Sequence, residues 1–225
     1  MPGFFVTGTD TGVGKTLVAC ALLRRLAADG ATAVGMKPVA AGREETPAGR
    51  THPDVEALIG CSTVRAERAL VNPYALEEAI APHIAAAHEA VRIDLEHIVA
   101  CHARLAGIAR WTVVEGVGGF RVPLNDSQDA ADLARMLALP VVLVVGMRLG
   151  CLNHALLTQE TVLSRGLRLA GWVANRIDPD MARCAENIEF LARAVAAPLL
   201  GEIPFVADGG DARVRAAADR LRLPE

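Results

Sequence analysis

Short apolar runs rich in β-branched residues recur along the chain, and longer segments with a helical repeat separate them. The runs lie at Phe4–Thr7, Ala33–Met36, Thr112–Glu115, Val141–Val145, Leu169–Ala174 and Leu199–Ile203. Runs of this length and composition are typical of strands. Val141–Val145 is apolar at every position, as expected for a strand of a parallel sheet that helices cover on both faces.

Between these runs, apolar residues repeat at three- or four-residue spacing. Val18, Leu22 and Leu26 line one side of a predicted helix, with Arg24 and Arg25 on the other. Similar repeats occur at Leu95, Ile98, Val99, His102 and Leu105, at Ala185, Ile188, Ala192 and Val195, and at Val214, Ala217, Ala218 and Leu221.

The segment 43–63 is less regular, and we expect a loop followed by a short helix. Alternating strands and helices predict one α/β domain over residues 1–225, with a mostly parallel sheet flanked by helices on both faces. In such sheets ligands bind beyond the carboxyl ends of the strands, so the residues that follow each run are the candidates for function.

The composition fits a globular protein with a large core. The chain has 225 residues, 52% of them hydrophobic, and a formal net charge of −3. This balance gives no basic surface for nucleic acid and no polybasic segment for a membrane. No apolar run is long enough to cross a bilayer, and no secretory signal is visible, so we expect a cytoplasmic protein. The five cysteines are widely spaced without a CxxC pair, which argues against disulfides and thiolate zinc sites.

The first strand leads into a glycine-rich loop and then directly into a helix. The loop reads Gly-Thr-Asp-Thr-Gly-Val-Gly-Lys-Thr over residues 8–16. Glycines let several backbone N–H groups face one anion, Lys15 can reach the β- and γ-phosphates, and the Thr16 hydroxyl can bind Mg²⁺. The usual motif has glycine at position 9, where this chain has Thr9. The alternative is a glycine-rich turn that only caps the helix.

A phosphate loop needs an acidic partner for the metal. Glu115 ends a predicted strand before a glycine-rich turn, and Asp54 is a second candidate. Each has a simpler interpretation: Glu115 as a solvated strand-end acid, and Asp54 as an acid in the first turn of a helix.

Other candidates also follow strands. Lys37 comes directly after the second run, where its charge would lie near Lys15 and could stabilise developing negative charge; the alternative is a surface lysine. The segment 146–153 joins a buried strand to a helix and could offer backbone amides to a carboxylate, or be a plain connection. Asn175 could contact a nucleotide base.

Together these segments resemble the dethiobiotin synthetases, a P-loop ligase family of biotin biosynthesis. The resemblance extends over nearly the whole chain and is carried by residues 5–16, 37–39, 114–119, 149–155, 171–175 and 198–204. The early position of the first glycine is usual in this family.

The resemblance implies a homodimeric ligase that uses ATP and Mg²⁺. Its small-molecule substrates would be 7,8-diaminopelargonate and CO₂. One amine would take up CO₂ as a carbamate, ATP would phosphorylate the carbamate, and the second amine would close the ureido ring of dethiobiotin, with release of ADP and phosphate.

The resemblance also implies roles for residues at matching positions. The catalytic residues would be Lys37, Lys15 and Thr11, and the Mg²⁺ ligands would be Thr16, Asp54 and Glu115. The nucleotide would be bound by Gly12, Val13, Gly14, Lys15, Thr16, Leu17, Asp54, Glu115, Gly116, Val117, Gly118, Asn175, Arg176, Pro204, Phe205, Val206 and Asp211. The substrate would contact Thr11, Lys37 and Ala41 and, across the dimer interface, Gly150, Cys151, Leu152 and Asn153.

Two positions depart from the family. Ala41 stands where a serine is common, which removes one hydrogen bond worth about 0.5–1.5 kcal/mol. Asp211 stands where the family often has glutamate.

Two other functions are found on related P-loop folds. A nucleotide-switch ATPase of the partitioning or division type usually has an extra lysine in the loop where this chain has Asp10. A cobalamin-type amide-forming ligase normally includes a glutaminase domain, for which the chain is too short.

Overall fold

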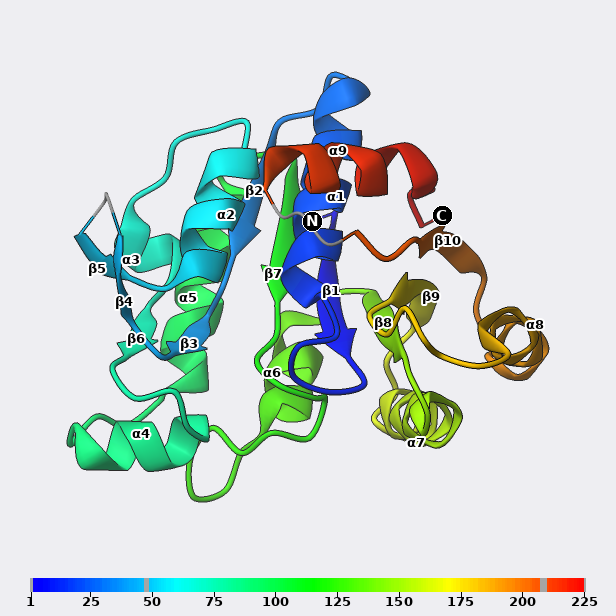
Figure 1. Cartoon of the computed structure of the whole chain (residues 1–225). Helices are drawn as coiled ribbons and strands as arrows, with labels where there is room; N and C mark the ends of the chain where they lie inside the picture. Colours follow the sequence, from blue (N-terminus) through cyan, green and yellow to red (C-terminus); the bar gives the residue numbers. More distant parts are fainter. Residues whose placement is uncertain (1, 47–48, 207–209, 225) are drawn as a thin grey trace.

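A six-stranded parallel sheet forms the centre of the protein, as a computed structural model shows for residues 2–46, 49–206 and 210–224 (Figure 1). Its strands are β1 (Gly3–Gly8), β2 (Ala33–Met36), β7 (Trp111–Glu115), β8 (Val141–Met147), β9 (Leu169–Arg176) and β10 (Leu199–Ile203). Their order across the sheet is β10-β9-β8-β1-β7-β2. All six coincide with the runs predicted from the sequence, so the predicted fold class is confirmed.

Helices cover both faces of this sheet. They are α1 (Lys15–Ala28), α2 (Pro53–Cys61), α3 (Arg68–Val71), α4 (Pro82–His88), α5 (Leu95–Ala106), α6 (Ala130–Leu137), α7 (Cys151–Ser164), α8 (Cys184–Ala194) and α9 (Asp211–Arg220). Helices α1 and α9 pack on one face, and α5, α6, α7 and α8 on the other. None of the helices in the described ranges is long and apolar enough to cross a membrane.

Alternation along the strands divides the core into two layers. Phe4 and Val6 of β1 face the layer built with α1 and α9, whereas Phe5 faces the opposite layer. Successive side chains of a strand point to opposite faces, so a strand covered on both sides is apolar throughout. All seven residues of β8 are buried accordingly.

Two small sheets lie beside the carboxyl end of β2. Strands β3 (Val39–Ala41) and β6 (Tyr74–Leu76) pair in parallel, and β4 (Glu44–Thr46) and β5 (Gly49–Thr51) pair antiparallel. The sequence pattern predicts the short helix α2 within the segment 43–63 but not the β4–β5 pair before it. These additions border the candidate site on the side of Lys37.

Candidate active site

The carboxyl edge of the sheet carries one large cavity of about 800 Å³. Eleven of the residues predicted from the sequence line it: Thr11, Gly12, Gly14, Lys15, Thr16, Lys37, Ala41, Asp54, Glu115, Val117 and Gly118. The strand register explains why they meet, because Met36 lies beside Val114 and Val6 beside Glu115. Lys37 and Glu115 are therefore brought together by neighbouring strand ends.

The phosphate loop between β1 and α1 is anchored to the sheet by Val13, one of the loop's own residues, which packs on β1 and β8. This valine is 1% exposed, and a Cβ at Gly8 or Gly146 would come within 2.5 Å or 2.8 Å of its methyl groups. Glycine at these two positions thus makes room for the loop to lie on β1 and β8. Gly12 and Gly14 have φ angles of +74° and +92°, which glycine adopts without strain.

Lys15 lies at the start of α1 with its ammonium turned back onto the loop. Its Nζ donates to the Asp10 carbonyl at 2.9 Å. Burial, followed by the charge of Lys37, lowers the pKa of Lys15 to about 8. The nearby backbone amides and this lysine give the helix N-terminus a positive potential, which favours the binding of phosphate.

Lys37 is the most enclosed cation of the cavity, with a side chain 4% exposed. Its Nζ contacts Glu115 Oε1 at 2.5 Å, Asp54 Oδ2 at 3.1 Å and the Gly116 carbonyl at 3.1 Å. Burial alone would lower the pKa of Lys37, but the two carboxylates outweigh it and raise this pKa. Lys37 is therefore a permanent cation in the neutral pH range.

The two carboxylates differ in their surroundings. Burial raises the pKa of Glu115 even though Lys37 opposes it. For Asp54 the effect of burial is outweighed by Lys37, with a smaller contribution from Thr16, and its pKa is lowered. Among the described residues Glu115 Oε2 is buried without a hydrogen-bond partner.

This donor set fits a hard cation. Thr16 Oγ1 donates to Glu115 Oε1 at 3.0 Å, so a hydroxyl and a carboxylate already converge beside the phosphate loop. Oxygen ligands, few of them from protein, are what Mg²⁺ takes beside a bound phosphate. The unpartnered Glu115 Oε2 and the raised pKa of Glu115 both indicate a carboxylate with room for an additional positive charge.

Several residues of the cavity were not predicted from the sequence. His52 caps α2 by accepting from the Asp54 amide at 3.1 Å, which orients the first turn that carries Asp54. The segment 79–82 and the residues Val122 and Pro123 form an apolar part of the lining. Alanine, isoleucine and proline in a loop carry no signal in one sequence.

Asp10 also has a role that the motif alone does not indicate. Its carboxylate accepts from the Thr11 amide at 2.7 Å and forms an ion pair with Arg148, which follows β8. Asp10 therefore joins the phosphate loop to the connection between β8 and α7.

The remaining predicted residues lie around this cavity rather than in its wall. Asn175 at the end of β9 donates from Nδ2 to the Val13 carbonyl at 2.7 Å, directly beneath Gly14. Arg176 pairs with Glu202. Leu17 and Asp211 line a second cavity, where Asp211 pairs with Arg24 and Arg215.

The last predicted groups lie at strand and helix ends. Residues 204–206 follow β10, and Phe205 is exposed. Residues 150–153 form the first turn of α7, at the same edge of the sheet as the phosphate loop. The roles of these surrounding residues stay predictions.

A parallel sheet whose first strand leads through a glycine-lysine-threonine loop into a helix defines a P-loop nucleotide-binding protein. A family model described as an AAA domain matches residues 2–213. The ATP-dependent dethiobiotin synthetase BioD of Aromatoleum aromaticum is 54% identical over 221 residues, which cover 98% of this chain and 97% of that protein. That of Xanthomonas oryzae pv. oryzae is 50% identical over 223 residues, or 99% and 98% of the two chains. The chain belongs to the ATP-dependent dethiobiotin synthetase family.

Solved structures share the fold at low identity. The MinD cell division protein of Aquifex aeolicus superposes with a TM-score of 0.57 at 17% identity, over 96% of this chain and 87% of that one. A ParA family ATPase of Chlorobium tepidum gives 0.57 at 11% identity, over 98% and 90%. These likenesses concern the fold alone.

Proposed function

We propose that the protein makes dethiobiotin from 7,8-diaminopelargonate, CO₂ and ATP, and that it does so with Mg²⁺ as cofactor. The observation that carries this proposal is the pairing of two lysines in one cavity. Lys15 belongs to the phosphate loop, and Lys37 is fixed by Glu115 and Asp54 beside it. A reaction that forms a carbamate and then phosphorylates it develops negative charge at two neighbouring places.

The phosphates of ATP are bound by the loop. On binding, Lys15 Nζ exchanges the Asp10 carbonyl for phosphate oxygens. The negative phosphate favours the charged form of Lys15, which burial disfavours. The backbone amides of residues 12–17 surround the same phosphates. Base recognition is assigned to Asn175, to residues 204–206, which follow the strand paired with β9, and to Asp211 at the start of α9.

Lys37 holds the carbamate and the transferred phosphoryl group. Its three donors are all used, on Glu115, Asp54 and the Gly116 carbonyl, so one of them has to be exchanged for a substrate oxygen. Thr11 and Ala41 line the part of the cavity assigned to the diamine. These residues act by position and charge, and no side-chain nucleophile is required.

Thr16, Asp54 and Glu115 would hold Mg²⁺. When bound, the ion would neutralise the phosphate charge that builds up during transfer.

The family also implies a homodimer in which residues 150–153 of one subunit reach the substrate carboxylate of the other. Leu149, directly before them, is 96% exposed, and Leu157 of α7 is exposed as well, so apolar side chains that a second copy would cover lie beside these residues and support a contact there. We place the reaction in the cytoplasm, where ATP is available.

The direct test is product formation by the full chain. Incubation with diaminopelargonate, bicarbonate, ATP and Mg²⁺ should give the cyclic urea by mass spectrometry, together with one ADP for each product. Omitting the diamine is the control and should suppress ADP formation. ADP release that does not depend on the diamine, without a cyclic urea, would contradict the proposal and favour a nucleotide-switch ATPase.

A further inference from the structure

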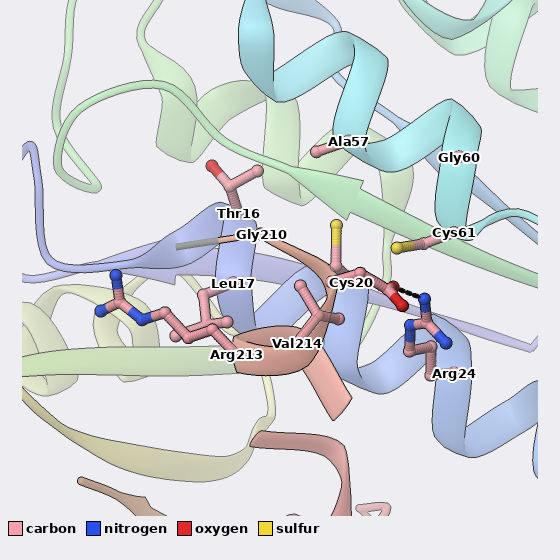
Figure 2. A pocket seen from close by; sticks show the side chains of 11 residues that line it. Thr16, Leu17, Cys20, Arg24, Ala57, Gly60, Cys61, Gly210, Arg213 and Val214 are labelled. Atoms are coloured by element: carbon pink, nitrogen blue, oxygen red, sulfur yellow. Dashed lines mark ion pairs between the residues drawn. The ribbon is translucent and has the colours of Figure 1, made fainter. Parts of the chain in front are cut away.

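A second cavity of about 440 Å³ lies between α1, α2 and α9 (Figure 2). It shares Thr16 with the first cavity, and Leu17 and Asp211, which are assigned to the nucleotide, also line it. Two cysteines line it, Cys20 from α1 and Cys61 from the end of α2. Figure 2 shows both sulfur atoms pointing into the space between the two helices. The proposed reaction has no use for a thiol.

The two cysteines line the same cavity from neighbouring helices and differ in their environment. Cys20 is 1% exposed, whereas Cys61 is partly exposed to the cavity. Of the two thiols, Cys61 is therefore the more accessible to a small reagent that enters the cavity, and Cys20 lines the same cavity.

Arg24 supplies a cation to this pair. It lies one turn after Cys20 on α1, it lines the same cavity as both cysteines, and it pairs with Asp211 of α9. A neighbouring cation stabilises a thiolate, which is the reactive form of cysteine. The neighbouring Cys20 thiol, followed by Arg24, lowers the pKa of Cys61 to about 6, whereas Cys61 and burial raise the pKa of Cys20.

We propose that Cys20 and Cys61 form an oxidisable thiol pair that reacts with small peroxides. The Cys61 thiolate attacks one oxygen of hydrogen peroxide, the O–O bond breaks, and the products are a sulfenic acid at Cys61 and hydroxide. The Cys20 sulfur then attacks the sulfenic sulfur, its proton leaves with the hydroxyl group as water, and a disulfide joins α1 to α2. Two thiols are oxidised and one peroxide is reduced to two waters.

The first test is the relative reactivity of the cysteines. The full chain is treated briefly with iodoacetamide at neutral pH, and labelling is followed for each cysteine by peptide mass spectrometry. Cys184 is the internal control, because it is also partly exposed but burial raises its pKa. Cys61 should react at least about tenfold faster than Cys184. Equal rates would overturn the proposal.

The second test is the disulfide. Hydrogen peroxide should produce a peptide that links Cys20 to Cys61 and reverts on reduction. In Cys20→Ser the reaction should stop at a sulfenic acid on Cys61 that dimedone traps, and Cys101→Ser should behave as the parent chain. Arg24→Gln should slow the labelling of Cys61 severalfold. Oxidation that links neither cysteine, or links them equally well to others, would refute the pair, and none of these readouts depends on dethiobiotin synthesis.

Discussion

Lys15 and Lys37 are the only lysines in the chain, since every other basic side chain apart from histidine is arginine. An ammonium group is a compact charge whose pKa responds to burial, whereas a guanidinium stays charged. Burial lowers the pKa of Lys15 to about 8, while two carboxylates raise the pKa of Lys37. Lys37 is therefore a constant cation, and Lys15 is one whose charge depends on its ligand.

This difference predicts a pH dependence of nucleotide binding. Below about pH 8 Lys15 is charged in the free protein, and above this pH it loses its proton unless a phosphate is bound. The affinity for ATP should therefore be greatest below pH 8 and fall as the pH rises above it. Calorimetric titration between pH 6.5 and 9.5 measures this, and Lys15→Arg should remove the decline. An affinity that stays constant up to pH 9.5 would contradict the lowered pKa.

The same group affects the stability of the ligand-free protein. The pKa of Lys15 is lower in the folded than in the unfolded chain, so the unfolded chain binds more protons between about pH 8 and the ordinary lysine value of 10.5. The free energy of unfolding contributed by Lys15 should therefore increase with pH over this window. Lys15→Met should be more stable than the parent at pH 7 in denaturant titrations, although it should not bind ATP. A less stable variant would show that the buried ammonium is not unfavourable.

Lys37 carries the prediction for catalysis. Lys37→Ala should bind ATP nearly as well as the parent and form no detectable dethiobiotin, as measured by calorimetry and by mass spectrometry of the product. Removing the cation leaves Glu115 buried without its partner, which costs about 3–5 kcal/mol of stability. The control is Lys37→Met combined with Glu115→Gln, which should recover much of this stability but no activity. An active Lys37→Ala would exclude Lys37 from the mechanism.

At the level of single elements, the phosphate loop offers a matched pair of glycines. Gly12 and Gly14 both have positive φ, but a Cβ at Gly12 would meet nothing within 4 Å, whereas one at Gly14 would lie 2.2 Å from Asn175 Nδ2. Gly12→Ala should cost about 1–2 kcal/mol from backbone strain. Gly14→Ala should cost more, because it also displaces Asn175 from Val13, and it should weaken ATP binding more strongly. Equal effects in denaturant unfolding and ATP titration would show that Asn175 does not support the loop.

The strands of the central sheet and several helices were predictable, whereas the two small sheets and three of the helices were not. The bounds of β2 and β10 agree with the apolar runs. All four residues of β2 are buried, and β10 combines buried and partly buried positions. In α8 the predicted inward residues Ala185 and Ala192 are exposed, and Leu191 is buried with Ile188. Alanine is tolerated on either face of a helix, so a repeat that includes it does not fix which face is buried.

Helices α3, α4 and α6 were not predicted, because four to eight residues are too few to establish a helical repeat. One local signal was present for α6. Asp129 and Asp132 form a reciprocal cap at its first turn. An aspartate at both positions is a variant of the more familiar pattern with glutamate or glutamine.

For the whole molecule, the sequence predicts which residues reach the active edge but not their neighbours. Lys37, Glu115 and the phosphate loop each lie at or directly after the end of a predicted strand, and parallel strands end at one edge, so these three could be expected together. No local sequence pattern predicts the strand order β10-β9-β8-β1-β7-β2. Contacts that depend on this order, such as Asp10 with Arg148, become visible only in the folded structure.

The proposed dimer gives a prediction on the same scale. Leu149 is 96% exposed beside the residues assigned to the partner's substrate. Leu149→Asp should convert a dimer to a monomer in analytical ultracentrifugation and raise the KM for the diamine, with little change in ATP affinity. Leu163→Asp is the control, because Leu163 is exposed at the other end of α7. A parent chain that sediments as a monomer would remove the basis for this role.

In the function proposed above, Asn175 has two tasks. Its Nδ2 holds the loop through Val13, while its buried Oδ1 has no partner among the described residues and is the atom that the proposed base contact would use. Asn175→Asp would replace the donor Nδ2 with an oxygen that faces the Val13 carbonyl. The two oxygens would repel each other, and the loop would bind phosphate less tightly. A lineage of this enzyme that moved from adenine to guanine through this substitution would therefore need a second, compensating change beneath Gly14.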